Sequence, residues 1–154
     1  GVRVSSELSD LYQEVVLDHG KRPRNFGPLE GATHRAEGLN PLCGDRVNVA
    51  IIVTGDTITD AHFEGSGCAI SKASASLMTE AIKGHTIGEA EALFREFQSA
   101  ITAPMDQDVD LEHLGKLAVL AGVREFPARI KCASLAWHTL HAAIVKSPAP
   151  ASTE

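Results

Sequence analysis

No apolar run in the 154-residue sequence approaches the roughly 18 residues that a membrane-spanning helix needs. The N-terminal residues do not form the charged and then apolar pattern of a secretory signal either. Positive charge is scarce, since 14 Lys and Arg stand against 20 Asp and Glu and the net charge is −6. Such a chain has no general basic field for nucleic-acid phosphates. These features predict a cytoplasmic protein that binds neither membranes nor nucleic acid.

Cysteine is also rare, and its count is informative. The sequence holds three cysteines, and an odd number does not suit a disulfide framework. In a reducing compartment such thiols are more often free, catalytic or bound to metal. Cys43, Cys68 and Cys132 lie far apart along the chain. Any site that they share must therefore be assembled by the fold and not by a short local motif.

The length and composition predict one packed domain over residues 1–146. Hydrophobic residues make up 44% of the chain and charged residues 22%, which is typical of a globular protein. Residues 147–154 read Ser-Pro-Ala-Pro-Ala-Ser-Thr-Glu. This segment has no means of burying itself, so we predict a flexible C-terminal tail.

The spacing of apolar residues predicts strands first and helices after them. β-Branched residues alternate over 46–53, a turn follows at Gly55-Asp56, and strand-like composition continues over 57–64, with a further strand expected over 33–38. Helices are predicted over 6–19, 70–82, 87–99 and 111–121 and after Pro127, the third of them opened by a capping box of Thr86 and Glu89. This order predicts an α+β domain, in which a small antiparallel sheet of about three strands packs against several helices.

The residues around each cysteine indicate a metal site. Glycines flank Cys43 and Cys68 and would let backbone approach an ion closely. Helix N-termini are expected next to Cys68 and Cys132, where the helix dipole would lower the thiol pKa. Asp45, two residues after Cys43, would be the fourth donor of a tetrahedral set.

Residue types alone do not choose the metal. Zinc and a [2Fe–2S] cluster would give the same formal charge on three thiolates and one carboxylate. Because a carboxylate binds soft metals less tightly than a thiolate, one position of such a site can exchange. On spacing alone, the three cysteines are also compatible with small buried hydrophobic residues that share no site.

Three cysteine motifs, in this order, resemble those of the IscU/NifU family of iron–sulfur assembly proteins. The resemblance covers nearly the whole chain apart from its tail. The motifs are Asn40-Pro41-Leu42-Cys43-Gly44-Asp45, then Gly65-Ser66-Gly67-Cys68-Ala69-Ile70-Ser71 with Ala73-Ser74-Ala75-Ser76, and Phe126-Pro127-Ala128-Arg129-Ile130-Lys131-Cys132-Ala133.

Two departures make the chain similar to the SufU branch of that family. Lys131 stands before the third cysteine, where IscU proteins have His, and the segment from Phe94 to Arg124 is longer than in IscU. The resemblance implies a SufE/IscU-like fold and a role as sulfur acceptor for the cysteine desulfurase SufS. It also implies a tightly held zinc ion on Cys43, Asp45, Cys68 and Cys132.

The resemblance further implies how sulfur would be taken up. A His of the desulfurase would replace one zinc ligand and free a cysteine to attack the enzyme's persulfide. Cys43 is the expected acceptor because it shares a glycine-flanked loop with Asp45. Arg129 is expected to hydrogen-bond a thiolate or Asp45, or to contact the partner, and Lys131 to offset the charge of the site.

Other interpretations stay open at this point. The same ligands would serve a scaffold that assembles a nascent iron–sulfur cluster and passes it to apo-proteins, with other SUF assembly proteins as further partners. A purely structural zinc site is a second alternative, and a cysteine hydrolase is the least favoured because no His has a pairing motif with any Cys. His138 and His141, three residues apart, are expected to be an exposed helix face and not a second metal site.

Overall fold

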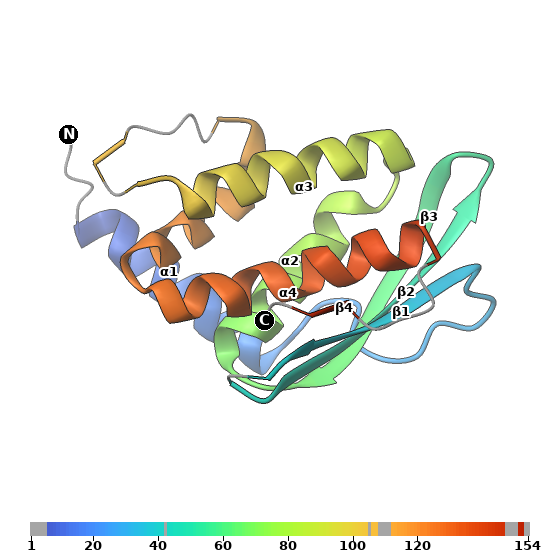
Figure 1. Cartoon of the computed structure of the whole chain (residues 1–154), viewed down its shortest axis with the longest axis horizontal. Coiled ribbons are helices and arrows are strands. Elements are labelled where there is room, and N and C mark those ends of the chain that lie inside the picture. The colour runs from blue at the N-terminus through green and yellow to red at the C-terminus, as the bar shows by residue number, and fades with distance from the viewer. Residues whose placement is uncertain (1–5, 42, 105, 108–111, 147–150, 153–154) are drawn as a thin grey trace.

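The computed structural model describes residues 6–41, 43–104, 106–107, 112–146 and 151–152. It confirms the predicted α+β class, with helices gathered on one side of a sheet (Figure 1). The elements in chain order are α1 (Ser6–Lys21), β1 (His34–Asn40), β2 (Asp45–Thr54), β3 (Thr57–Ser66), α2 (Ala69–Ile82), α3 (Ile87–Thr102), the 3₁₀ segment η1 (Glu112–Glu125), α4 (Pro127–Ile144) and β4 (Ala151–Ser152).

The sheet has four strands in the order β3-β2-β1-β4. The three predicted strands form an antiparallel meander, and β4 adds to its edge in parallel with β1. Ala151 pairs with Gly38 and Ser152 with Leu39. Two residues of the predicted tail are thus part of the sheet, while 147–150 and 153–154 lie outside the described residues. The division into a domain over 1–146 and a flexible tail stays a prediction.

The alternation of β2 brings one polar side chain onto the apolar face of the sheet. Val47, Val49 and Ile51 are buried there, while Arg46 and Asn48 point to solvent. Asp45 lies two residues before Val47 and therefore on the same face of the strand, and it is 1% exposed. Helix α4 packs against β1 and β2, and α2 packs against β3, so this carboxylate faces the helices (Figure 1).

The core between the helices is built around Trp137 of α4. Its ring is fully buried and stacks on Phe97 of α3 with the ring centroids 5.1 Å apart. Helix α3 begins as predicted, because Thr86 Oγ1 accepts from the Glu89 N–H and the Glu89 carboxylate accepts from the Thr86 N–H. Both hydrogen bonds of a capping box are therefore present.

The helix predicted over 111–121 is present from Glu112 on as a 3₁₀ helix. Residue 111 lies outside the described residues, and from Glu112 the chain forms the 3₁₀ segment η1, which is interrupted at Gly115. Gly115 has a φ of 56°, which a right-handed helix does not permit. Across the helices of the described residues, none is long and apolar enough to cross a membrane.

Candidate metal centre

The four predicted ligands come together near the starts of β2 and α2 and the second turn of α4. One ligand atom each from Cys43, Asp45 and Cys132 lies within 4.8 Å of the others. Cys68 stands beside this group, with its Sγ 4.0 Å from Asp45 Oδ2. The fold thus joins residues that are up to 89 positions apart in the chain.

Cys43 occupies the turn that connects β1 to β2 and is exposed to solvent. The turn is closed by a hydrogen bond of 2.9 Å from the Gly44 N–H to the Asn40 carbonyl. Gly44 has a φ of +73°, a conformation that favours glycine. This geometry places the Cys43 thiol at the surface, directly over a buried carboxylate.

Asp45 is fixed from two sides. The backbone N–H of Cys68 donates to its Oδ1 over 2.9 Å, and the side-chain amide of Asn40 donates to its Oδ2 over 3.2 Å. Gly67 has a φ of +145°, and a Cβ added to it would overlap Asp45 Oδ1. The glycine before Cys68 is therefore required by the close approach of backbone to this carboxylate.

Cys68 is the N-cap of α2. Its Sγ accepts a hydrogen bond of 3.4 Å from the Ser71 N–H, which satisfies one of the free donors at the start of the helix. Cys68 is half-buried, so it is less exposed than Cys43 and more exposed than Cys132. The predicted helix N-terminus at this cysteine is confirmed.

Cys132 differs from the sequence-based expectation. It is completely buried, and its Sγ lies 3.6 Å from the Sγ of Cys43 and 3.6 Å from the amide nitrogen of Asn40. Burial raises the pKa of the Cys132 thiol, and the carboxylate of Asp45 acts in the same direction. The prediction of a lowered pKa rests on the N-terminus of α4, which begins at Pro127, but Cys132 lies beyond the first turn, where the dipole has weakened.

Arg129 is a basic residue whose side chain interacts with the cysteine thiols. A hydrogen bond to Cys132, together with the negative charge that the cysteines carry when ionised, raises the pKa of the exposed Arg129 guanidinium. Tyr12 of α1 lies near the same groups, and partial burial raises the pKa of its phenol. Lys131 is half-buried beside Cys132, and within the described part of the chain its side chain makes no hydrogen bond or ion pair.

The donors fit a tetrahedral metal ion. Zinc–sulfur bonds of about 2.3 Å at a tetrahedral angle separate two thiolates by about 3.8 Å, and the sulfurs of Cys43 and Cys132 are 3.6 Å apart. That separation is far longer than a disulfide of about 2.05 Å. A buried thiolate and a buried carboxylate in contact are unfavourable unless a cation balances them. Thiolates with one carboxylate suit zinc and also iron.

The histidine pair on α4 is engaged elsewhere. His141 Nδ1 pairs with the Glu91 carboxylate at 2.9 Å, and the His138 ring meets Phe94 edge-on with centroids 5.1 Å apart. Burial lowers the pKa of His138, which favours its neutral form. Neither residue belongs to a metal-binding group of three among the described side chains.

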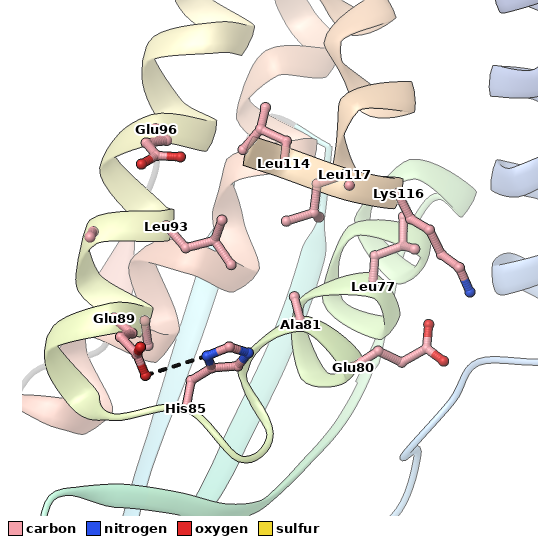
Figure 2. Close-up of a pocket in the computed structure, with 13 residues that line it drawn as sticks. Leu77, Glu80, Ala81, His85, Glu89, Leu93, Glu96, Leu114, Lys116 and Leu117 are labelled. Atoms are coloured by element: carbon pink, nitrogen blue, oxygen red, sulfur yellow. Dashed lines mark ion pairs between the residues drawn. The ribbon is translucent and has the colours of Figure 1, made fainter. Parts of the chain in front are cut away.

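A hollow of about 600 Å³ lies between α2, α3 and η1, away from the candidate ligands (Figure 2). Leucines of all three elements line it, with carboxylates among them; these are Leu77, Leu93, Leu117, Glu80, Glu89 and Glu96. His85 Nδ1 already pairs with Glu89 at 3.4 Å. None of the four candidate ligands lines this hollow.

Asn40 is a member of the site that no sequence pattern singled out. The residue is 1% exposed and contacts both Asp45 and Cys132 through its side-chain amide. The one signal in the sequence is its place three residues before Cys43. Its contact with Cys132, 92 positions away, arises only when α4 docks on the sheet.

The chain matches a known family over most of its length. The family model described as the NifU-like N-terminal domain matches residues 11–133. A zinc-dependent sulfurtransferase SufU from Bacillus subtilis is 43% identical over 92% of this chain and 95% of its own length. An iron–sulfur cluster assembly scaffold protein IscU from Streptococcus pyogenes is 42% identical over 92% of this chain and 87% of its own length.

The fold has close counterparts among solved structures. A protein from Fervidobacterium islandicum AW-1, described as a scaffold for iron–sulfur cluster assembly in the SUF system, superposes with a TM-score of 0.79. It is 35% identical in sequence, and the match covers 91% of this chain and 99% of that one.

Proposed function

The chain belongs to the family of NifU-like N-terminal domains, and on this premise we propose that it is a SufU-type sulfur acceptor for iron–sulfur cluster assembly. It takes persulfide sulfur from a cysteine desulfurase of the SufS type and acts as that enzyme's partner, not as a stand-alone enzyme. The observation that carries the proposal is the exposed Cys43 thiol directly beside a buried donor set that suits zinc.

The zinc ligands that we propose are the four donors described above, namely Cys43, Asp45, Cys68 and Cys132. When bound, zinc supplies the positive charge that keeps these thiols deprotonated at neutral pH. Burial raises the pKa of Cys132 in the protein alone, and the charge of zinc would oppose that effect. Arg129 adds a hydrogen bond to the same sulfur, and Lys131 adds positive charge nearby.

The group that accepts sulfur is Cys43. Its thiolate attacks the terminal sulfur of the desulfurase persulfide and forms a new sulfur–sulfur bond on Cys43. The sulfur–sulfur bond in the desulfurase breaks, and its electron pair leaves with the enzyme's own cysteine thiolate, which takes up a proton. No oxidant or reductant is consumed. The exposed turn allows this attack while Asp45 and Cys132 stay buried beneath.

A reducing compartment suits this chemistry. The three cysteines form no disulfide in the structure, and persulfide transfer requires that none forms. We therefore place the activity in the cytoplasm, with the desulfurase as direct partner and other SUF assembly proteins or apo-proteins downstream.

A second candidate function rests on the same donors. The 42% identity to an IscU scaffold protein favours a site on which a cluster is assembled and passed on. In that case iron and sulfide are cargo, held by the cysteines and Asp45. A cluster reconstituted anaerobically on the chain and then transferred to an apo-protein would support the scaffold function.

The test of the main proposal combines metal analysis with an enzyme assay. Protein purified without added metal is expected to hold about one zinc ion per chain, and to raise the turnover of a SufS-type desulfurase several-fold. Protein stripped of zinc and then reloaded serves as the control for metal dependence. Zinc-loaded protein that leaves the desulfurase rate unchanged would contradict the proposal.

A further inference from the structure

Asn40 lies between the exposed turn that carries Cys43 and the buried ligands Asp45 and Cys132. It is the last residue of β1, and its partner across the strands is Asp45, the first residue of β2. Its backbone carbonyl closes the Cys43 turn by accepting from the Gly44 N–H. One residue therefore borders both the exposed acceptor turn and the buried ligands.

The side chain of Asn40 joins two ligands from distant parts of the chain. Its amide nitrogen lies 3.2 Å from Asp45 Oδ2 and 3.6 Å from Cys132 Sγ. A primary amide has two N–H donors, which is one for each of these neighbours. The Asn40 Oδ1 atom is buried without a partner among the described residues. An unpaired buried oxygen costs stability, so the amide at this position is not favoured by packing alone.

We propose that Asn40 is a positioning residue, which holds Asp45 and Cys132 in place while Cys43 is engaged with sulfur. The inference rests on the proposed function. With Cys68 N–H on Oδ1 and Asn40 on Oδ2, both oxygens of Asp45 are oriented. Among the described residues the Asn40 side chain makes no hydrogen bond to Cys43, so its two hydrogen bonds do not depend on Cys43 as a ligand.

The experiment compares Asn40→Asp and Asn40→Ala with the control Asn48→Ala, which removes an exposed amide from β2. Zinc affinity is measured by competition with a chromophoric chelator. Loss of a residue that orients metal ligands typically costs about 10–100-fold in affinity. We expect this loss for both Asn40 variants and none for the control. Asn40→Asp keeps the size but replaces the donor by an acceptor that faces Asp45, so it should bind zinc no better than Asn40→Ala.

The zinc affinities with Asn40 and with Asn40→Asp are then measured in a Cys43→Ser background. The inference predicts that Asn40→Asp weakens zinc binding by a larger factor there, because Asp45 and Cys132 then carry more of the binding. Thermal unfolding of the zinc-free proteins separates positioning from packing. If Asn40→Asp lowers the melting temperature of the zinc-free protein as much as that of the zinc-loaded one, its role is structural and the inference is wrong.

The two proposals fail in different ways. Asn40 variants that bind zinc within about twofold of the wild type, in both backgrounds, would overturn the positioning role whatever the desulfurase does. Wild-type protein that leaves the desulfurase unaffected, while Asn40 variants still lose zinc, would overturn the sulfur-acceptor function and leave the positioning role standing.

Discussion

Cys43 and Cys132 place their sulfurs 3.6 Å apart, yet their surroundings are opposite. Cys43 lies on an exposed turn between two strands, while Cys132 is fully buried in α4 and has its sulfur against the amide of Asn40. The buried cysteine is held by the core, and the exposed one is open to a partner protein. One donor set can thus combine a fixed ligand with a releasable one, and this is what a sulfur acceptor needs.

The largest expected effect is that of Cys43→Ser on sulfur transfer. Without the thiolate that attacks the persulfide, stimulation of the desulfurase should fall to background. Because Cys43 is exposed, the free energy of unfolding of the zinc-free protein should change by no more than about 0.5 kcal/mol. Desulfurase turnover and denaturant unfolding measure the two effects. The control is Pro41→Ala, an exposed change in the same turn that keeps the thiol.

A variant that still stimulates the desulfurase as well as wild type would assign the acceptor role to another cysteine. The contrast between the exposed and the buried thiol would then have no functional meaning.

For zinc affinity, in contrast to sulfur transfer, the buried Cys132 should matter more than the exposed Cys43. Cys132→Ser removes the ligand that the core holds. Loss of a residue that only orients a ligand costs up to about 100-fold in metal affinity, so we expect the zinc affinity of this variant to fall further. Cys43→Ser should cost less, since Asp45, Cys68 and Cys132 remain. Competition with a chelator measures both constants. Equal losses, or a greater loss for Cys43→Ser, would contradict the division into fixed and releasable ligands.

Alkylation of the zinc-free protein tests the same contrast without any partner. Burial raises the pKa of Cys132, so at a given pH less of it is thiolate, and a thiol pKa that is higher by about one lowers that fraction about tenfold. Cys43 should therefore react with iodoacetamide at least about tenfold faster. Cys132 should stay slow as the pH is raised from about 7 to about 9. Peptide mapping by mass spectrometry follows each site, and the two rates should converge in the unfolded chain.

The smallest expected effect is that of Gly67→Ala. An added Cβ would overlap Asp45 Oδ1 and displace the carboxylate, so zinc affinity should fall about tenfold. The matched control is Gly55→Ala, at a positive φ with open space around it. Both variants should lose about 1–3 kcal/mol of stability through backbone strain, but only Gly67→Ala should lose zinc. Equal zinc affinities would show that Asp45 is not held against this glycine.

Local patterns are sufficient to predict much of the fold and to nominate the residues of the candidate site. The alternation of Val47, Val49 and Ile51 carries back to Asp45 and places it on the buried face. The spacing of Thr86 and Glu89 marks the start of α3 because a capping box depends only on neighbouring residues. The three cysteines are grouped into one site by the resemblance of their short motifs to those of one family.

What could not be predicted depends on how distant elements dock. The link between Asn40 and Cys132 requires both the β1–β2 register and the packing of α4 on the sheet. The raised pKa of Cys132 follows from burial in the core, which outweighs the helix dipole at that depth along α4. β4 and the interruption of η1 at Gly115 likewise depend on tertiary context and backbone conformation.

The proposed function depends above all on Cys43 as the residue that receives the sulfur. A direct experiment mixes zinc-loaded protein with a SufS-type desulfurase and a limiting amount of cysteine, quenches with an alkylating reagent, and maps the peptides by mass spectrometry. We predict one additional sulfur atom on the peptide that contains Cys43 and none on those that contain Cys68 or Cys132. Additional sulfur on either of the other two, or sulfur that remains only on the desulfurase, would contradict this assignment.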